Sequence, residues 1–575
     1  MASEQHHYDQ AKDSTFQNPQ SQGWRSMFYW LWIRKAVIFL LIVCATVITN
    51  EFSAISFGTR VPGTPPQCPQ VPALYPSEHA NLWKTINKTI TSDAFTSRAV
   101  NWLAGAVRIK TESYDKMGPV GIDLRWEAFM PFHNYLREVF PLVHSMLLLK
   151  TVNTYGLLFT WEGKDRGKKP ILLVAHQDVV PVDPSTVEKW LHPPYSGYLD
   201  GTLDDKNGLV GILSTIEVLL EGGFRPSRTV VLAFGFDEEA SGLQVKCYER
   251  YSSDSESKPL ALKGAHKLSA TLEAAYGRDS FAMIIDEGSG FMEQYNSTFA
   301  IIVTTEKGYL DTRIDVALPG GHSSVPPEHT SIGILAAAIV EIESQPYPVH
   351  LERASPVYAS LQCYAEHAVT LPLSLRKLIK ESAFSDNALE ELEKRLFSDG
   401  AYKSLVGTTQ AVDLIQGGVK ANALPERAFA VVNNRISTES SVDATKRYYA
   451  SLIAPLARKY NLTFRPFREH PTSLDVTIAA VGTMMLSDAW DSALEPAPVS
   501  PTGPGAVAYQ LLSGSIKGAY NSRRSLQGDN IATMPGIMSG NTGIYLINHA
   551  AKTSHICYRH AILLELVAEY IPVQP

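Results

Sequence analysis

Acidic and histidine residues follow three short runs of valine, isoleucine, leucine and other apolar residues. Carboxylates that gather at one place repel one another unless a cation lies between them. Imidazole and carboxylate groups without thiolates suit a zinc site that keeps positions open for water and substrate. A charge cluster on a solvated rim is the alternative, and its repetition after three apolar runs argues against it. The candidate metal ligands are His176, Asp204, Glu239 and Asp286.

Two further acidic residues could support catalysis at such a site. Residues i and i+2 of a strand point to the same face, so Asp178 could orient the ring of His176. Glu238 precedes a candidate ligand, and we expect it to be the general base that moves a proton from water to the leaving amine. If one carboxylate bridged two ions about 3.5 to 4 Å apart, the site would be a two-metal centre of the aminopeptidase type.

The elements that carry these residues are predicted to form a parallel α/β sheet. The apolar runs 171–175, 229–236 and 281–285 have the length of buried strands. Residues 208–220 are apolar at helical spacing and end at a glycine pair, so a helix connects the first two strands. A doubly wound sheet is the default for this pattern, and ligands collect at the carboxyl ends of its strands. The acidic pair before the helix could also be a simple N-cap.

A second, inserted domain is predicted after about residue 304. A strand pattern at 310–317 is followed by a glycine-rich motif at 320–324 and by a helical pattern at 331–342. We expect a cytosolic tail (1–35), a membrane anchor (36–57), a proline-rich stem (58–95), a catalytic domain in two parts (96–303 and 471–575) and an inserted lid or dimerisation domain (304–470).

The membrane anchor, an N-terminal transmembrane helix, is predicted from an uncharged apolar stretch at 36–49 that follows aromatic residues at 27–33. Arg34 and Lys35 can snorkel, and tryptophan and tyrosine suit a lipid bilayer interface. A cleaved signal peptide is the alternative, but the long polar segment 1–23 is atypical of one. The positive-inside rule then leaves the tail cytosolic and the body lumenal. Glycosylation triplets at Asn87, Asn296 and Asn461 fit the lumenal side.

Composition excludes several classes of protein. With 575 residues, 45% hydrophobic and 19% charged, the chain is a globular protein of about three or four units, not a disordered or polytopic membrane protein. Its net charge of -7 gives no basic surface, and we expect no nucleic-acid partner. Its five cysteines are scattered and lack Cys-x-x-Cys spacing, so we expect neither a disulfide framework nor a thiolate zinc site.

In order and spacing, these motifs resemble the co-catalytic zinc peptidases that include aminoacylase and glutamate carboxypeptidase, and most closely their carboxypeptidase S (Gly-Xaa carboxypeptidase) branch. The resemblance extends from about residue 106 to 542. It implies a zinc-exopeptidase-like α/β catalytic domain with a mainly parallel sheet, and a smaller inserted α+β domain that serves as a lid or in dimerisation. The motifs include 109–115 (IKTESYD), 153–158 (NTYGLL), 204–206 (DDK), 286–288 (DEG) and 321–324 (GHSS).

The resemblance also implies how the candidate ligands are used. Asp204 would bridge two zinc ions, with His176 and Asp286 on one ion and Glu239 on the other. Asp178 would orient His176, and Glu238 would be the proton shuttle. The peptide bond between Asp204 and Asp205 would be cis.

Three residues of the inserted domain are implied to contact the substrate. His322 would hydrogen-bond the oxyanion, often across a homodimer in relatives. Asn422 and Arg435 would hold the terminal carboxylate, a task that suits the planar fork of arginine. An exposed arginine in a salt bridge at a sheet edge is the alternative for Arg435.

The sequence departs from the family pattern in two places. The Gly-Arg-Gly that relatives place before the Asp-Asp-Lys motif is missing, and Gly543 stands where they have aspartate. The histidine that completes the second metal site has no clear match. Among His549, His555 and His560, His555 is the closest, and no fifth ligand is assigned.

The expected function is a membrane-anchored, lumenal dizinc carboxypeptidase of the vacuole or endomembranes. Its substrates would be short peptides with a free C-terminal carboxylate, with glycine before the scissile bond. An N-acyl-amino-acid amidohydrolase and an inactive peptidase-fold binding protein are the alternatives.

Overall fold

The computed structural model of the 575-residue chain describes residues 67–114, 117–198, 204–240, 264–288, 290–467, 480–522, 531–540 and 555–557. The predicted tail and membrane anchor, and the first residues of the predicted stem, lie outside these ranges. Within them, no helix has the length and apolar character needed to cross a membrane. Helix α2 (Ala80–Ile90) lies inside the predicted stem.

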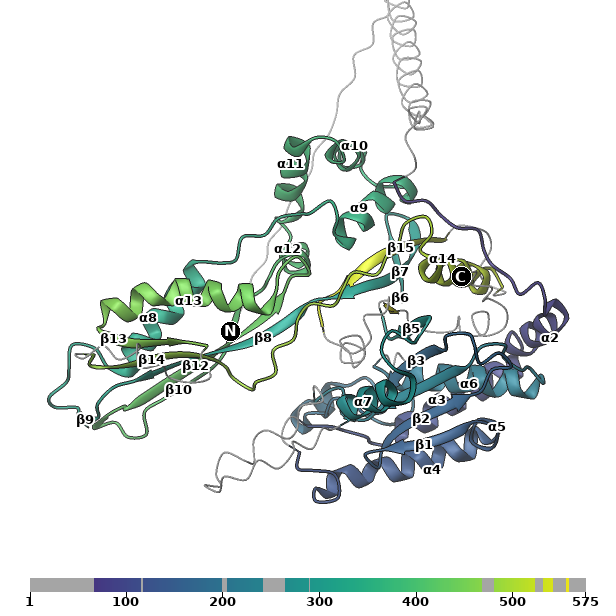
Figure 1. Ribbon diagram of the computed structural model, residues 1–575, viewed down its shortest axis with the longest axis horizontal. Helices are drawn as coiled ribbons and strands as arrows, with labels where there is room; N and C mark the ends of the chain where they lie inside the picture. The colour runs from purple at the N-terminus through teal and green to yellow at the C-terminus, as the bar shows by residue number, and fades with distance from the viewer. Residues whose placement is uncertain are drawn as a thin grey trace, which may run out of the picture. The chain divides into compact units, whose positions relative to one another are not determined.

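A large sheet carries two of the four candidate metal ligands, His176 and Asp286. In the described part of the chain it has nine strands, in the order β1-β2-β4-β3-β5-β16-β7-β15 with β6 paired to β7 (Figure 1). The strands predicted at 171–175, 229–236 and 281–285 are confirmed as β3, β4 and β5. The strands are β1 (Leu148–Val152), β2 (Gly156–Trp161), β3 (Ile171–His176), β4 (Val230–Gly235), β5 (Met283–Asp286), β6 (Gly290–Gln294), β7 (Ser297–Glu306), β15 (Ile531–Met538) and β16 (His555–Cys557).

This sheet is mixed, so the prediction of a mainly parallel sheet is wrong in part. β3 pairs in parallel with β4 and β5, as predicted, whereas β1 and β2 pair antiparallel with their neighbours. A tight turn in which Asn153 and Thr154 have positive φ joins β1 to β2, and only antiparallel strands can be joined so closely. Because β2 is as apolar and as buried as β3, the sequence pattern did not reveal its direction.

Helices cover both faces of the large sheet. Successive residues of a strand point to opposite faces, and in β3 the apolar residues on both faces are buried against helices. Leu173 of β3 packs in the core formed with helix α6 (Lys206–Glu221), which confirms the predicted helix at 208–220. Leu172 packs on the other face, in the core formed with α7 (Gly264–Tyr276). The other helices of the α6-side core are α2, α3 (Asp93–Arg108), α4 (Phe129–Val139), α5 (Pro141–Met146) and α14 (Val507–Asn521).

A smaller sheet forms the inserted domain, in the order β10-β12-β8-β14-β13. Helices α8 (Ser331–Ser344) and α13 (Val442–Lys459) pack on it, and the predicted helix at 331–342 is α8. Lys307 alone separates β7 from β8, so the chain passes directly from one sheet to the other. The strands are β8 (Gly308–Ala317), β10 (Ala411–Gly417), β12 (Arg427–Ile436), β13 (Leu462–Pro466) and β14 (Gly482–Asp488), with a separate ribbon of β9 (Gly321–His322) and β11 (Ala423–Leu424).

Four helices between α8 and β10 form a further core with β7 and β15 of the large sheet. These helices are α9 (Pro356–His367), α10 (Leu373–Ser382), α11 (Asp386–Leu396) and α12 (Gly400–Val406).

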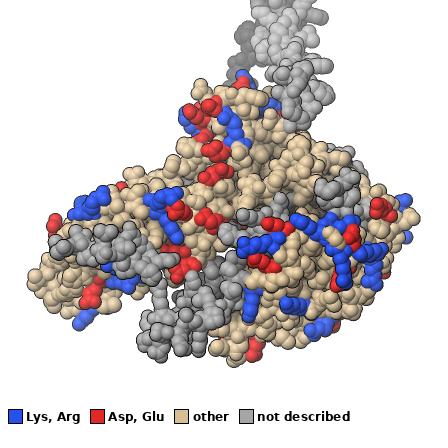
Figure 2. Space-filling model, viewed as in Figure 1, with Lys and Arg blue, Asp and Glu red and all other residues tan. Residues whose placement is uncertain are grey.

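The space-filling view in Figure 2 shows acidic and basic side chains interspersed over one face of the molecule.

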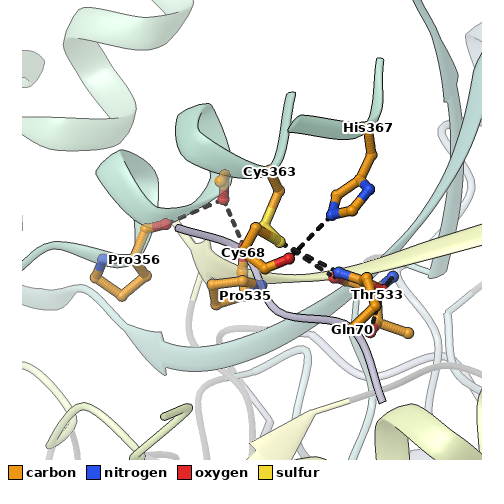
Figure 3. The surroundings of a disulfide bond; sticks show 8 residues. Cys68, Gln70, Pro356, Cys363, His367, Thr533 and Pro535 are labelled. Carbon is orange, nitrogen blue, oxygen red and sulfur yellow. Dashed lines mark hydrogen bonds between the residues drawn. A yellow bond between two sulfur atoms is a disulfide. The ribbon is translucent and has the colours of Figure 1, made fainter. Parts of the chain in front are cut away.

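A disulfide joins Cys68 to Cys363 of α9 (Figure 3). The expectation from cysteine spacing that the chain has no disulfide framework is therefore wrong for this pair. The two cysteines are 295 residues apart in sequence, and only the packing of α9 beside the N-terminal segment brings them together. The His367 ring, one turn further along the helix, lies 2.9 Å from the carbonyl oxygen of Cys68.

The same N-terminal segment covers β15, which is the last strand of the large sheet. The Gln70 side-chain amide donates to the carbonyl of Thr533 at 2.8 Å, and its oxygen accepts from the Thr533 amide at 2.9 Å. Gln70 thus satisfies both backbone groups of an edge residue that would otherwise need another strand. Further along, the Leu74 amide donates to the carbonyl of Gly514 in α14.

We expect Cys363→Ala to lower the free energy of unfolding by about 2 to 5 kcal/mol, because the disulfide closes a long loop in the unfolded chain. Urea unfolding under non-reducing conditions measures this. The double variant C68A/C363A is the control and should be no less stable than C363A alone. An unchanged unfolding midpoint in C363A would show that the bond does not contribute to stability.

Candidate metal centre

His176 stands at the carboxyl end of β3, between the ends of β4 and β5. The three strands are parallel neighbours in the order β4-β3-β5. Their ends therefore lie at one edge of the sheet, and the residues that follow each strand meet there. The His176 side chain is 4% exposed. The convergence predicted from the three apolar runs is what the structure contains.

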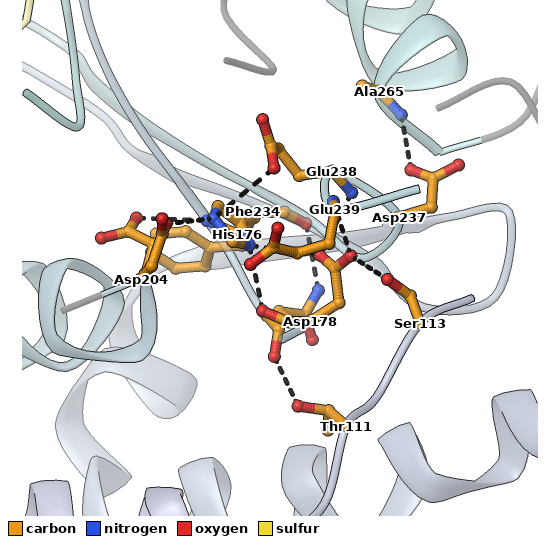
Figure 4. A network of polar contacts seen from close by, with 12 residues as sticks. Thr111, Ser113, His176, Asp178, Asp204, Phe234, Asp237, Glu238, Glu239 and Ala265 are labelled. Carbon is orange, nitrogen blue, oxygen red and sulfur yellow. Dashed lines mark hydrogen bonds and ion pairs between the residues drawn. The ribbon is translucent and has the colours of Figure 1, made fainter. Parts of the chain in front are cut away.

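Carboxylates surround the imidazole of His176 (Figure 4). Its Nε2 atom lies 3.1 Å from Asp204 Oδ1, 3.9 Å from Glu238 Oε2 and 3.8 Å from Glu287 Oε2. On the other side of the ring, Nδ1 lies 3.2 Å from Asp178 Oδ1. One ring nitrogen thus faces the acidic cluster, and the other is held by Asp178, as the i, i+2 spacing predicted.

Asp178 also binds the backbone that follows β4. Its carboxylate accepts hydrogen bonds from the amides of Glu238 at 3.2 Å and Glu239 at 3.0 Å. Burial opposes the charge of Asp178, but its contacts with His176, Ser113 and the Glu239 amide keep its pKa below the usual value. Asp178 is therefore an anion that fixes both the imidazole and the acidic loop.

Two overlapping groups of side chains could hold metal ions. His176, Asp204 and Glu239 each offer an atom within 4.8 Å of the others, and so do His176, Asp205 and Glu287. The peptide bond between Asp204 and Asp205 is cis, as the resemblance implied. The two groups share His176 but differ in their acids: Asp204 lies with Glu239, and Asp205 lies with Glu287. The two neighbouring aspartates therefore point their carboxylates toward different glutamates.

The pKa shifts show how crowded these acids are. Burial, opposed by His176 and reinforced by Asp204, raises the pKa of Glu239 to about 7. Burial also raises the pKa values of Glu238 and Glu287. A divalent cation would replace the protons that these carboxylates otherwise hold. The donor set, one imidazole with several carboxylates and no thiolate, therefore fits metal ions such as zinc.

Glu287 is a candidate ligand that the sequence analysis did not select. The predicted ligand Asp286 lines a cavity with His176, Glu238 and Glu287, but it belongs to neither of the two groups. Asp286 is the last residue of β5 and Glu287 follows it, and adjacent residues of an extended chain face opposite ways. Sequence alone left open which of the two faces His176.

Two charged residues beside the ligands have structural roles. The Asp237 carboxylate accepts from the Ala265 amide at 3.2 Å, at the start of α7. The Lys206 side chain is buried and donates to the carbonyls of Ala106 and Ile109 at the end of α3. Burial lowers the pKa of Lys206 to about 7. The loop that carries Asp204 is thus attached to α3 through the buried side-chain nitrogen of Lys206.

The substrate-contacting residues predicted in the inserted domain lie at two different places. His322 is in β9, where its Nδ1 lies 2.7 Å from the hydroxyl oxygen of Ser324, and the Asn422 carbonyl accepts from the Ser323 amide. Arg435 is near the far end of β12, paired with Tyr309 of β8. Eight residues of strand separate Arg427 from Arg435, roughly 26 Å. Within one chain, Arg435 is therefore not beside Asn422 and His322.

The C-terminal histidines are only partly described. The backbone of His555 is in β16, paired in parallel with Ile284 of β5. β16 therefore runs next to the strand that ends at Asp286. His549 and His560 lie outside the described residues, as does Gly543.

Known proteins resemble this chain in sequence and fold. The model of peptidase family M20/M25/M40 matches residues 172–391. Carboxypeptidase S of Saccharomyces cerevisiae is 36% identical over 489 residues, which cover 83% of this chain and 80% of the yeast protein. N-fatty-acyl-amino acid synthase/hydrolase of Bos taurus is 30% identical over 453 residues, 76% of each chain. The crystal structure of human carnosine dipeptidase 1 has a similar fold, with a TM-score of 0.50 at 13% identity over 83% of this chain and 91% of that one.

We expect Glu287→Gln to weaken zinc binding by at least about tenfold more than Asp286→Asn, since even an outer-shell partner typically contributes that much. The reason is that the Glu287 carboxylate, and not that of Asp286, lies in a group with His176. Titration with zinc against a competing chelator measures both affinities. A larger loss in Asp286→Asn would return the ligand role to Asp286.

Proposed function

Because the chain belongs to peptidase family M20/M25/M40 and is a metallocarboxypeptidase, we propose that it binds two zinc ions and releases the C-terminal residue of short peptides that have glycine before the scissile bond. The observation that carries the metal part of this proposal is the convergence of His176 with Asp204, Glu239 and Glu287. The glycine preference rests on the resemblance to Gly-Xaa carboxypeptidases alone.

The ligands are assigned to two ions. His176 and Asp204 would hold one ion, and Asp204 and Glu239 would hold the other. Glu287 completes the His176 site in place of Asp286, because its carboxylate lies 3.8 Å from Nε2. Bound zinc would supply Lewis acidity, lowering the pKa of water and polarising the scissile carbonyl.

Glu238 is the residue that moves the proton in this proposal. It follows β4 and projects into the cluster, where its side chain is 14% exposed. Asp178 accepts from the Glu238 amide and so holds the backbone from which this carboxylate reaches the ligands. A carboxylate so placed can accept a proton from the attacking water and deliver it to the leaving amine nitrogen.

Arg435 binds the terminal carboxylate of the substrate in this proposal. It lies close to the passage between the two sheets, because its strand partner Tyr309 follows Lys307 and Gly308. Its guanidinium carbon is 5.8 Å from the centre of the Tyr309 ring, a contact that orients the planar fork. A fixed fork that binds a carboxylate in two places would select free C-termini.

His322 acts on a second copy of the chain in this proposal. β8 runs ten residues from Gly308 to Ala317 before the chain reaches His322, roughly 30 Å from the large sheet along the strand. At one edge of the smaller sheet, strand β10 exposes Leu414 and Ile415. The neighbouring helix α8 exposes Ile332 and Val340. An apolar helix face beside an open strand suits a symmetric homodimer.

The catalytic body is lumenal in this proposal, in the vacuole or another endomembrane compartment. The Cys68–Cys363 disulfide supports this location, because such bonds persist in oxidising compartments and are rare in the cytosol. The anchor at 36–57 remains a prediction from the sequence.

The second candidate function is N-acyl-amino-acid hydrolysis, which the similarity to N-fatty-acyl-amino acid synthase/hydrolase favours. The loop after Asp178 also exposes Val180, Trp190 and Leu191, which could contact an apolar acyl chain. Rates on Gly-Xaa dipeptides and on N-acyl-amino acids separate the two functions. Zinc analysis tests the third possibility, an inactive binding protein, which predicts no bound zinc.

We expect Glu238→Gln to keep its zinc and to lose at least about 100-fold in kcat, because general-base catalysis contributes 10²- to 10⁴-fold. The measurement is steady-state hydrolysis together with metal analysis of the same sample. Glu239→Gln is the control, and it should lose zinc as well as activity. A zinc-loaded Glu238→Gln with wild-type turnover would remove Glu238 from the mechanism.

We expect Arg435→Lys to slow hydrolysis of free-acid dipeptides far more than of their C-terminal amides, since lysine lacks the planar fork. Arg427→Lys is the matched control on the same strand, because Arg427 pairs with Asp315 and not with substrate in this proposal. The comparison needs kcat/KM for both substrate types. Equal losses on acids and amides would show that Arg435 does not bind the carboxylate.

We expect inactive Glu238→Gln and His322→Ala proteins to regain activity when mixed. In a mixed dimer, the His322→Ala subunit keeps an intact metal centre and receives His322 from its partner. With random exchange, about one quarter of all sites would be complete. The measurement is the hydrolysis rate after subunit exchange, with each variant alone as the control. A mixture no more active than its components would place His322 in its own subunit.

A further inference from the structure

The segment around residues 111–114 runs beside the residues that follow β3. Glu112 forms a parallel bridge with Val179. The Val179 amide donates to the Thr111 carbonyl at 3.0 Å, and the Ser113 amide donates to the Val179 carbonyl at 3.1 Å. These contacts hold the segment in an extended conformation, and its side chains alternate between two faces.

On one face of this segment, Glu112 forms hydrogen bonds with the loop that follows Asp178. Its carboxylate accepts from the Tyr195 hydroxyl at 2.6 Å and from the Val182 amide at 3.2 Å. On the other face, the Thr111 hydroxyl donates to the carbonyl of Gln177 at 2.6 Å, and Ser113 lies on that same face. The alternation thus directs Ser113 toward the residues that follow β3.

The Ser113 hydroxyl donates to Asp178 Oδ2 at 2.7 Å, and both side chains are buried (Figure 4). This is the shortest contact that the structure gives the carboxylate of Asp178. The other donors to that carboxylate are the amides of Glu238 and Glu239 and the ring of His176. Those three donors all belong to residues of the centre itself. Ser113 is the donor that comes from a separate part of the chain.

We propose that Ser113 is a positioning residue of the metal centre, because its hydroxyl fixes the rotation of the Asp178 carboxylate. Asp178 in turn orients the ring of His176 and holds the backbone of Glu238 and Glu239. One hydroxyl outside the cluster therefore sets the geometry of two proposed ligands and of the proposed general base. The inference rests on the proposed function, since it assigns Ser113 a part in metal binding.

The inference predicts that removing the hydroxyl weakens metal binding without a matching loss of fold. A buried carboxylate that loses one of its donors turns or shifts, and outer-shell partners of this kind typically contribute about 10- to 100-fold in metal affinity. Ser113→Thr keeps the hydroxyl, whereas Ser113→Val introduces a side chain of nearly the same shape as threonine that lacks the hydroxyl. These two variants differ in the hydrogen bond and in little else.

The experiment compares wild type, Ser113→Thr and Ser113→Val, with Thr111→Val as the matched control on the same segment. Thr111→Val also loses a buried hydroxyl, but one that donates to a backbone carbonyl and not to Asp178. The readouts are zinc affinity by chelator competition, the thermal midpoint of each metal-free protein, and kcat and KM for a Gly-Xaa dipeptide at saturating zinc.

We expect Ser113→Val to bind zinc about 10- to 100-fold more weakly than Ser113→Thr, with Thr111→Val close to wild type in affinity. The metal-free midpoints of Ser113→Val and Thr111→Val should fall by similar amounts. Ser113→Ala replaces Ser113→Val in the comparison if the latter does not fold.

Two outcomes would overturn the inference while the proposed function stands. One is equal zinc affinity in Ser113→Thr and Ser113→Val. The other is a loss in Thr111→Val as large as that in Ser113→Val, which would reduce the effect to packing of the segment. Failure of the wild type to bind zinc would instead overturn the proposed dizinc function, and this inference with it.

Discussion

The repulsion among buried carboxylates at the ends of three adjacent strands is the constraint on which this structure depends. β3, β4 and β5 are neighbours, so the acids that follow them meet around a single imidazole. Glu287 is buried and Glu238 and Glu239 are partly buried, so water screens their charges poorly, and burial raises the pKa of all three. Cations are the natural counter-charge for such a cluster, so the metal chemistry follows from the order of the strands.

The residues around the cluster are arranged so that the acids cannot move apart. Asp178 binds the ring of His176 and the amides of two glutamates. Lys206 attaches the loop of Asp204 to the carbonyls at the end of α3. These supports are buried and hydrogen-bonded, which is what permits charged groups to remain in the interior. The strands provide approximate positions, and the supporting hydrogen bonds fix the orientation of each side chain.

The inserted domain and the N-terminal segment show how distant parts of the chain serve one catalytic body. Lys307 alone separates β7 from β8, and its buried side-chain nitrogen donates to carbonyls at the end of α12. Cys68 and Gln70 attach the N-terminal segment to α9 and to the edge of β15. The same strand, β15, ends at Met538, whose carbonyl accepts from the Lys307 amide at the junction between the sheets.

The sequence by itself determined the strands that carry the site, because a strand buried on both faces must be a continuous apolar run and the acids after it are conspicuous. It placed His176, Asp204, Glu238 and Glu239 together, along with the support from Asp178. Tertiary structure decided what depends on direction and on contacts between remote segments. These are the antiparallel pairing of β2, the position of Glu287, and not Asp286, in a group with His176, the Cys68–Cys363 bond, and the separation of Arg435 from Asn422. Apolar patterns report burial, but strand direction, side-chain orientation and long-range pairing are set only when the whole chain packs.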